Sequence, residues 1–446
     1  MAFLWSLFSF IIVIGVLVSV HEYGHFWAAR RCGVKVHRFS IGFGKVLWKR
    51  IDKKGTEFAL SAIPLGGYVK MLDERNEDVP EALKSQSFNH KSVAQRAFII
   101  AAGPLANFLF AILAYWVVYL VGIPSVKPVI NNVQENSIAA QAHLQPQYQI
   151  IAVDGSPTAD WESINMLLAS KVGNHNATLT LIPFGETDSR LAVQKQLDLT
   201  NWYFDPEKES TFESLGIEPV SNKIEMKISR VVEHSPAEKA GLQVSDMLYT
   251  AQKTPFNWTD FVAQVNKGEN IDLQVQRGDQ FFATTLQPQT NENGKWYVGI
   301  MPSVQPIADK YRTELKYGML ESLQKGIEKT GQLSLLTIKV IGKLFTGDLS
   351  LKNLSGPISI AKGAGASSSI GFIYYLSFMA LISVNLGIMN LFPLPVLDGG
   401  HLVFLAAEGI MRKPVSERIQ NIGYRLGASM LLLLTIFALF NDVLRL

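Results

Sequence analysis

Four long apolar stretches, separated by more polar segments, dominate the pattern of this chain. They cover residues 3–20, 97–123, 371–391 and 427–440, and Val443-Leu444 would lengthen the last one. A helix needs about 20 mostly apolar residues to cross the hydrocarbon core of a membrane. The second stretch contains Gly103-Pro104, which is better tolerated in a membrane bundle than in a water-exposed helix. The pattern therefore predicts a polytopic α-helical membrane protein with four transmembrane helices.

The segment between the first two spans alternates in the manner of β-strands. Residues 36–71 include runs such as Thr56-Glu57-Phe58-Ala59-Leu60-Ser61, with glycines at positions 42, 44, 55, 66 and 67. This period of two predicts β-hairpins. The run Arg38-Phe39-Ser40-Ile41-Gly42-Phe43-Gly44 is apolar enough to dip into the membrane, where a strand edge could pair with an extended substrate. A sheet on the cytosolic surface is the alternative.

Residues 127–303 contain an internal repeat. The first copy is marked by Val133, Ser137, Ala139, Ala142, Leu144, Gln145 and Ile150, and the second repeats that order and spacing with Val231, Ser235, Ala237, Ala240, Leu242, Gln243 and Leu248. Each copy has a short helical turn between two strands. The repeat therefore predicts two related α+β domains in tandem.

The spacing becomes helical again over residues 313–345, with Leu315, Met319, Leu323 and Ile327 on one face. This helix could lie on the outer membrane surface or pack against the protein's own domains. Residues 347–369, rich in glycine and serine, are expected to form a loop back to the membrane. The expected boundaries are 1–35 (first transmembrane helix), 36–94 (membrane-dipping β-hairpin region), 95–124 (second transmembrane helix), 126–220 and 221–305 (the repeated domains), 306–369 (amphipathic helix and loop), 370–404 (third transmembrane helix), 405–426 (cytoplasmic loop) and 427–446 (fourth transmembrane helix).

Composition agrees with a membrane protein and narrows its partners. Of the 446 residues, 48% are hydrophobic and only 18% are charged. A net charge of +3, without a basic tract interleaved with aromatic residues, gives no sign of nucleic-acid binding. The single cysteine, Cys32, excludes an internal disulfide framework. The N-terminal stretch lacks a basic leader region and a small-residue cleavage site, so we expect it to remain as an anchor.

Basic residues indicate the orientation of the spans. They collect after the first span and before the last one, at Arg30, Arg31, Lys35, Arg38, Lys45, Lys49, Arg50, Lys53, Lys54, Arg412, Lys413, Arg418 and Arg425. Because cytoplasmic loops carry an excess of lysine and arginine, these segments are expected in the cytoplasm. Four crossings then place both termini and the repeated domains outside.

The first span leads directly into a zinc-protease signature, His21-Glu22-Tyr23-Gly24-His25. Histidines four residues apart lie on one helix face and can bind one metal ion. Zinc with an open coordination position acidifies its water, and Glu22 is placed to take the proton of that water. Ionisable residues at membrane depth are costly, so their presence indicates function.

The end of the third span supplies further candidates. Asn390-Leu391-Phe392-Pro393-Leu394-Pro395-Val396-Leu397-Asp398-Gly399-Gly400-His401 predicts a broken helix that lines a cavity. A catalytic zinc ion needs three protein ligands and one water. Asp398 is the best candidate for the third ligand, while His401 competes on chemical grounds and a solvated helix cap is a structural alternative for Asp398.

These motifs together resemble the site-2 protease family of intramembrane zinc metalloproteases, in the branch found in Gram-negative bacteria. The resemblance implies His21, His25 and Asp398 as ligands of Zn²⁺, Glu22 as general base, and Asn390 as a substrate-binding or oxyanion-supporting residue. It also implies a substrate-holding edge strand around Ile41, Gly42, Phe43 and Gly44, with Pro393 and Pro395 in the substrate-binding segment.

The repeated domains resemble the PDZ fold, whose members bind extended peptide ends by strand addition. The second copy, Ser235-Pro236-Ala237-Glu238-Lys239-Ala240-Gly241-Leu242 followed by Asp246, is the more typical. The first copy departs from it, with His143 and Tyr148 at the positions of Gly241 and Asp246. A folded spacer that only blocks access is the alternative for both domains.

The expected function is hydrolysis of peptide bonds within transmembrane segments of single-pass membrane proteins, in the lipid bilayer. The resemblance implies a bacterial inner membrane, an envelope stress response, and substrates that are trimmed anti-sigma factors and remnant signal peptides. Two other classes compete with this prediction. One is a membrane scaffold that gathers exported polypeptides and holds a structural metal, and the other is a transporter, although the chain lacks the repeated membrane halves that transporters often have.

Overall fold

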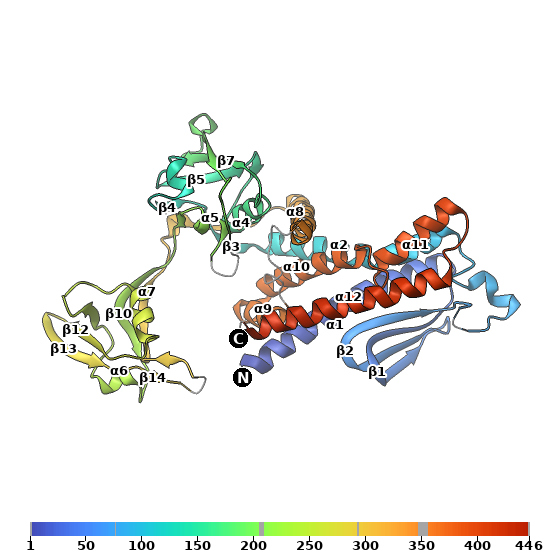
Figure 1. The fold of residues 1–446 in the computed structure, drawn as a ribbon, viewed down its shortest axis with the longest axis horizontal. Helices are drawn as coiled ribbons and strands as arrows, with labels where there is room; N and C mark the ends of the chain where they lie inside the picture. Colours follow the sequence, from blue (N-terminus) through green and yellow to red (C-terminus); the bar gives the residue numbers. More distant parts are fainter. Residues whose placement is uncertain (1, 76, 205–208, 292–293, 347–355, 445–446) are drawn as a thin grey trace.

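The structure is a computed structural model that describes all residues except 1, 76, 205–208, 292–293, 347–355 and 445–446. A bundle of helices carries a β-sheet at one end, and two β-rich units lie at its other end (Figure 1). Among the described residues, four helices are long and apolar enough to cross a membrane, in agreement with the predicted number of spans: α1 (Ala2–Arg31), α2 (Val93–Val121), α10 (Phe372–Leu391) and α12 (Glu417–Leu444).

Two of these helices extend well beyond their apolar stretches. Helix α1 continues to Arg31, so the HEYGH motif lies within it rather than after it. Helix α12 begins at Glu417, ten residues before the expected span. Helix α2 begins with a capping box formed by Ser92 and Gln95, and it continues through Pro104. Local helix signals thus fix the ends, while hydropathy identified only the apolar part of each helix.

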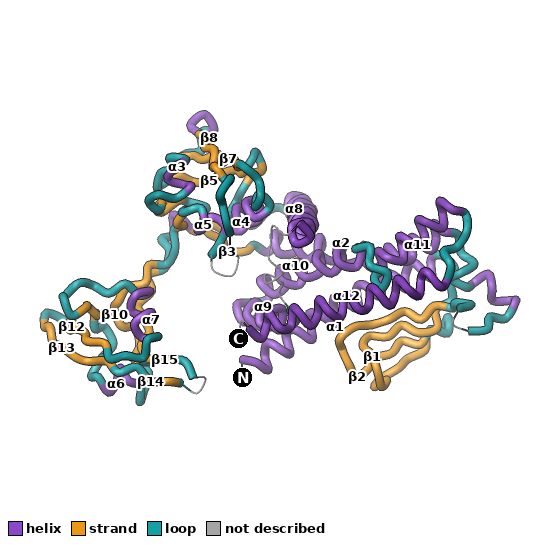
Figure 2. The backbone as a smooth tube through the Cα atoms, viewed as in Figure 1, coloured by secondary structure: helices purple, strands orange, loops and turns teal. Residues whose placement is uncertain are grey.

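Strands β1 (Val36–Ile51) and β2 (Glu57–Met71) form the sheet at the end of α1 (Figure 2). Both strands bend back on themselves. This is seen in the pairing, since Arg38 and Ile41 each have aligned partners in two different parts of β2. Ile41 lies opposite both Gly67 and Leu60. The sheet therefore has four segments in the order 67–71, 36–43, 57–63 and 46–51, and residues around Ile41 form an inner segment.

The two outer units share a local backbone conformation, in which a glycine packs against a serine, and this supports the internal repeat. Gly216 and Gly299 both have positive φ, at 84° and 80°, and a Cβ atom at either would lie 2.2 Å from the Cβ atom of Ser137 or Ser235, respectively. The N–H of Ala139 donates to the carbonyl of Leu215, just as Ala237 donates to Val298. Equivalent residues therefore make equivalent contacts in the two units.

Each outer unit has its own apolar core and its own sheet. The first unit contains β4 (Ile130–Val133), α3 (Ile138–Gln141), β5 (Tyr148–Val153), β6 (Ser156–Pro157), α4 (Trp161–Ala169), β7 (Asn176–Pro183), β8 (Val193–Asp198), α5 (Thr211–Ser214) and β9 (Ile217–Pro219). The second contains β10 (Lys223–Val231), α6 (Pro236–Lys239), β11 (Met247–Thr250), α7 (Trp258–Val265), β12 (Ile271–Arg277), β13 (Gln280–Leu286), β14 (Gln289–Thr290), β15 (Trp296–Tyr297) and β16 (Ile300–Gln305). In its five-stranded sheet, the order is β13-β12-β11-β10-β16.

A short two-stranded sheet and helix α8 (Met319–Thr346) join the outer units to the bundle. The sheet pairs β3 (Ile123–Val126), which follows α2, with β17 (Arg312–Leu315), which precedes α8. The amphipathic helix therefore begins at Met319, because the residues expected to be its first turn are used in this sheet. Helix α8 packs on α2, and a Cβ atom at Gly326 would lie 2.9 Å from the carbonyl oxygen of Ile112.

The loop expected over residues 347–369 is wrong for its second half. Residues 347–355 lie outside the described part of the chain, but α9 (Pro357–Ile370) is a helix. Its small residues permit close packing, since a Cβ atom at Gly365 would lie 2.2 Å from Ser6 Oγ. Glycine and serine, which indicate a loop in water, here allow two helices to approach one another. Helix α11 (Asp398–Met411) likewise occupies part of the expected cytoplasmic loop.

A carboxylate from another helix caps the start of α9. Asp442, near the end of α12, is only 2% exposed and accepts hydrogen bonds from the backbone N–H groups of Gly356, Ile358 and Ser359. It also accepts from Ser359 Oγ at 2.5 Å. These N–H groups have no partner within their own helix, so Asp442 fastens α9 to α12.

Replacing Asp442 by alanine is expected to destabilise the junction of α9 and α12 by about 1–3 kcal/mol, because buried N–H groups lose their acceptor. Thermal unfolding of the detergent-solubilised protein should show a lower Tm than for the wild type. Asp309→Ala, at an exposed side chain, is the control and should leave the Tm unchanged. Equal Tm values for the two variants would contradict the role of Asp442 as a cap.

Candidate metal centre

Three side chains from two distant parts of the sequence converge beside the bundle axis. His21 and His25 come from α1, and Asp398 is the first residue of α11. The Nε2 atoms of the two histidines lie 3.2 Å apart. Asp398 Oδ2 lies 3.2 Å from His21 Nε2 and 3.5 Å from His25 Nε2. Among the described residues, these three form the only cluster of histidine, cysteine or carboxylate side chains arranged to hold a metal ion.

The atoms that face one another in this cluster carry lone pairs rather than protons, so they could bind a metal ion. His25 Nδ1 lies 2.9 Å from the carbonyl oxygen of Ile99, which can only accept, so Nδ1 carries the proton and Nε2 of the neutral ring is left with a lone pair. Asp398 Oδ2 is buried without a hydrogen bond of good geometry, despite its close approach to His21. A cation between these atoms would satisfy them. Two imidazoles and one carboxylate are the donor set that suits catalytic zinc.

Glycines bring α1 and α2 close enough to seat the histidines. A Cβ atom at Gly24 would lie 2.2 Å from the carbonyl oxygen of Ala102, so the two backbones nearly touch there. At the next residue of α2 after Ala102, a Cβ atom at Gly103 would lie 2.3 Å from Nε2 of His25, the residue that follows Gly24. Gly103 therefore leaves the space that the imidazole of His25 occupies.

The break between α10 and α11 delivers Asp398 to the same place. Helix α10 ends at Leu391, and Pro393 and Pro395 lie in the short segment before α11. Cβ atoms at Gly399 or Gly400 would lie 2.2 Å from the carbonyl oxygens of Leu391 and Leu394, respectively. The two glycines thus allow α11 to fold back tightly on the end of α10, which fixes the position of the carboxylate.

An ion pair holds the far end of α11 against α2. Arg96 donates to both carboxylate oxygens of Glu408, at 2.5 Å and 3.1 Å. Both side chains are largely buried, and the geometry is bidentate. Because α2 also packs on α1, this contact ties the helix of Asp398 to the helix that packs against both histidines.

The sheet is fixed to the end of α1 near the cluster. Arg30 pairs with Asp52 in the turn between β1 and β2, and it also donates to Thr56 Oγ1 at 2.8 Å. Burial raises the pKa of Asp52, but hydrogen bonds from Arg30 and from the N–H groups of Thr56 and Lys54 outweigh it and hold this pKa below its ordinary value. Asp52 therefore stays ionised and anchors the sheet.

The remaining predicted site residues lie on several different elements. Glu22 follows His21 in α1, and a Cβ atom at Gly67 would lie 2.9 Å from Glu22 Cγ, so the outer segment 67–71 of β2 runs beside it. Asn390 is half-buried in the last turn of α10. The competitor His401 is directed elsewhere, with Nδ1 3.4 Å from the hydroxyl of Tyr424.

The structure corrects one expectation about the sheet. Ile41 has aligned partners on both sides and therefore does not lie on a free edge of the sheet, whereas Phe43 has one aligned partner, Ile63. Phe43 stacks on Tyr68, with ring centroids 6.2 Å apart. Alternation identified the strands, but it carries no information about their order, so it could not show which segment has a free edge.

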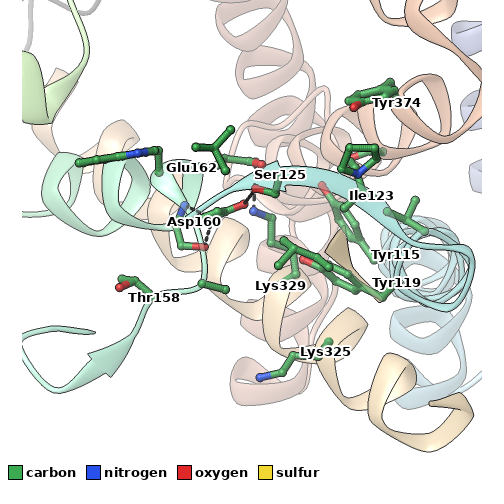
Figure 3. A pocket seen from close by; sticks show the side chains of 18 of the residues that line it. Tyr115, Tyr119, Ile123, Ser125, Thr158, Asp160, Glu162, Lys325, Lys329 and Tyr374 are labelled. Carbon is green, nitrogen blue, oxygen red and sulfur yellow. Dashed lines mark hydrogen bonds and ion pairs between the residues drawn. The ribbon is translucent and has the colours of Figure 1, made fainter. Parts of the chain in front are cut away.

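A large cavity lies apart from the metal cluster. It encloses about 1030 Å³ between α2, β3, α8, α10 and the first outer unit. Figure 3 shows Asp160, Lys329 and Tyr119 around it, and none of His21, His25 and Asp398 lines it. Lys329 reaches across to Glu162 of the first unit at 3.0 Å. This cavity therefore does not coincide with the candidate metal centre.

Sequence reasoning missed two residues that touch the histidines from α2. These are Gly103 and Asn107, and Asn107 Nδ2 lies 3.2 Å from His21 Nδ1. The available signal was an asparagine within an apolar span, one turn after a glycine.

Comparisons with known proteins cover the whole chain. The profile of peptidase family M50 matches residues 9–434. The chain is 68% identical over 446 residues to the regulator of sigma E protease of Haemophilus influenzae, and 66% identical over 446 residues to a Pasteurella multocida protein provisionally named as a zinc metalloprotease. It is 52% identical over 452 residues to the regulator of sigma-E protease RseP of Escherichia coli. All three alignments include 100% of both proteins.

Gly103→Ala is expected to lower the zinc content more than the free energy of unfolding. The added methyl group would clash with His25, and rotating the imidazole away from the cluster removes that clash with the least change to the helices. Zinc per protein, measured after purification and dialysis, should fall well below that of the wild type. Gly15→Ala in α1 is the matched control, since nothing lies within 4 Å of its added Cβ atom. Full zinc content in Gly103→Ala would show that the glycine does not shape the site.

Proposed function

The chain belongs to peptidase family M50, and on that premise we propose roles for its individual residues. It is a zinc metalloprotease of the site-2 type, whose substrates are membrane proteins cleaved within the lipid bilayer. A scaffold with a structural metal is not favoured, because structural zinc sites are usually closed by four protein ligands. The cluster in this chain offers three and is therefore suited to a catalytic ion.

In this proposal His21, His25 and Asp398 hold the zinc ion, and the observation that carries it is their convergence from α1 and α11. When bound, zinc polarises the scissile carbonyl and makes water acidic enough to be deprotonated near neutral pH. The chain's own contribution is to hold two imidazoles and a carboxylate in fixed positions. It leaves one face of the cluster for substrate.

Glu22 is proposed as the general base. It takes the proton of the attacking water and passes it to the nitrogen of the departing amine, which must be protonated as the peptide bond breaks. Its position next to His21, against the outer segment of β2, supports this role. Asn390, in the last turn of α10, is proposed to donate its amide N–H to the substrate carbonyl as negative charge develops there.

The substrate must be extended before it can react, because the carbonyl groups of a helix are already hydrogen-bonded. We propose that it pairs with the segment 67–71 of β2, which pairs with β1 along one edge and lies close to Glu22 at Gly67. Strand addition replaces the lost helical hydrogen bonds locally. The segment after α10, with Pro393 and Pro395, would then face the same substrate strand from the other helix.

The outer units are proposed to be PDZ domains that restrict entry to substrates already trimmed outside the membrane. Their repeated glycine and serine contacts support a common fold. The excess of basic residues near the sheet and between α11 and α12 supports a cytoplasmic site, with both termini and the outer units on the other side. Two relatives are named as regulators of sigma E, which supports anti-sigma factors as substrates, together with remnant signal peptides, in a bacterial inner membrane.

Glu22→Gln is expected to lower the rate of cleavage by at least about 100-fold, because the amide cannot accept the proton of the attacking water. The assay is cleavage of a single-pass substrate reconstituted with the enzyme in vesicles, accompanied by zinc analysis. Zinc content should remain that of the wild type, whereas His21→Ala should lose both zinc and activity. Undiminished cleavage by Glu22→Gln would remove the general base from the proposal.

Proline substitutions test the proposed substrate edge. Neighbouring residues in a strand direct their N–H groups to opposite sides, so either Tyr68→Pro or Val69→Pro removes an N–H that faces away from β1. That variant should fold and bind zinc but cleave at least about tenfold more slowly. Leu47→Pro, in the segment at the opposite edge of the sheet, is the control and should cleave normally. Normal cleavage by both edge variants would exclude this segment as the substrate-binding strand.

A further inference from the structure

One face of α2 contacts both histidines of the cluster at successive turns. The carbonyl oxygen of Ile99 accepts from His25 Nδ1, Gly103 lies against the ring of His25, and the amide of Asn107 lies 3.2 Å from His21 Nδ1. These positions are four residues apart, so they line up along the helix. Ile99 and Asn107 of α2 thus contact the Nδ1 atom of each imidazole, whereas Gly103 lies against Nε2 of His25.

Asn107 is held firmly in this position. It is fully buried, and its backbone carbonyl accepts a hydrogen bond from Ser383 Oγ of α10 at 2.8 Å. Its side-chain amide is drawn with nitrogen toward His21, and Oδ1 is left buried without a partner. The oxygen and nitrogen of such an amide are assigned from the hydrogen-bond network, so rotating the group exchanges their positions without moving the residue.

Metal binding decides which atom must face His21. A neutral imidazole has one N–H, and the Nε2 atom that binds a metal must be unprotonated. The proton of His21 therefore belongs on Nδ1, where it needs an acceptor, just as the Nδ1 proton of His25 has one in Ile99. An amide N–H cannot accept it, whereas the amide oxygen can.

We infer that Asn107 is a positioning residue of the metal site, whose amide oxygen accepts the Nδ1–H of His21 and fixes the tautomer that leaves Nε2 free for zinc. This inference rests on the proposed zinc site. Asn107 touches neither substrate nor metal. It favours the tautomer of His21 that is protonated on Nδ1 over the one protonated on Nε2, and it fixes the orientation of the imidazole ring.

The test compares two replacements of similar size by their zinc affinity. Zinc dissociation constants are measured for the full-length, detergent-solubilised protein by competition with a chromogenic chelator. Asn107→Leu offers no acceptor and should bind zinc about 10–100-fold more weakly than the wild type. Asn107→Asp offers only acceptors and should bind zinc at least as tightly as the wild type. The Tm of the metal-free protein and its rise on adding zinc are recorded for each variant, because a merely structural role would change the first rather than the second.

Two further variants separate the possible failures. Ser383→Ala removes the hydrogen bond to the Asn107 backbone but leaves the amide in place, so its zinc affinity should be unchanged. His21→Ala tests the site itself, and wild-type affinity in that variant would overturn the proposed zinc ligands. If His21→Ala loses zinc while Asn107→Leu binds within threefold of the wild type, only the role of Asn107 is overturned. Zinc binding by Asn107→Asp that is weaker than that of Asn107→Leu, with an intact metal-free Tm, would show that the amide donates to His21 instead. If Asn107→Asp does not fold, the comparison of Asn107→Leu with the wild type decides alone.

Discussion

The close approach of two imidazole nitrogens and one carboxylate oxygen is the constraint on which the rest of this structure depends. Atoms that all present lone pairs repel one another at 3.2–3.5 Å unless a cation lies between them. With one N–H on the Nδ1 side of each ring, no proton remains for the three atoms to share. The repulsion between these atoms therefore destabilises the metal-free folded protein, and a bound zinc ion would remove it. Without the ion, packing of the surrounding helices must hold the three side chains together.

Small residues and one ion pair supply that restraint. Glycines at positions 24 and 103 let α1 approach α2 closely, and Gly399 and Gly400 let α11 turn back on α10. Arg96 and Glu408 then join α2 to α11. In a bilayer, close packing and buried polar contacts hold helices together, because lipid is as apolar as the helices themselves. The glycines that shape the active site are thus also the residues that allow the bundle to form.

The three candidate ligands that converge in the structure could be named from the sequence, but the residues that support them could not. His21, Glu22 and His25 are read from their spacing on one helix, and the break at Pro393 and Pro395 marks Asp398 as an unusual carboxylate. Neither spacing nor composition could choose between Asp398 and His401, because that choice depends on how α11 folds back on α10. The contact of Asn107 with His21 also joins two helices, so no local pattern announces it.

The errors of the fold prediction have a common physical origin. Helix α9 was expected to be a loop because glycine and serine disfavour helices in water, whereas here they let α9 pack on α1 and Asp442 of α12 satisfies its first N–H groups. The sheet was found from its alternation, but its segment order, which leaves 67–71 rather than Ile41 beside Glu22, depends on long-range pairing. Local signals therefore gave the elements and the ligands, while contacts between elements decided the shape of the site.

X-ray absorption at the zinc K edge of the purified, full-length protein tests the central claim most directly. We expect one zinc ion per chain with two imidazole nitrogens and carboxylate or water oxygens at about 2.0–2.2 Å, and no sulfur in its coordination shell. In Asp398→Ala, the two imidazoles should remain and zinc binding should weaken. A sulfur ligand at about 2.3 Å, or a wild-type spectrum in Asp398→Ala, would contradict a zinc site shared between α1 and α11.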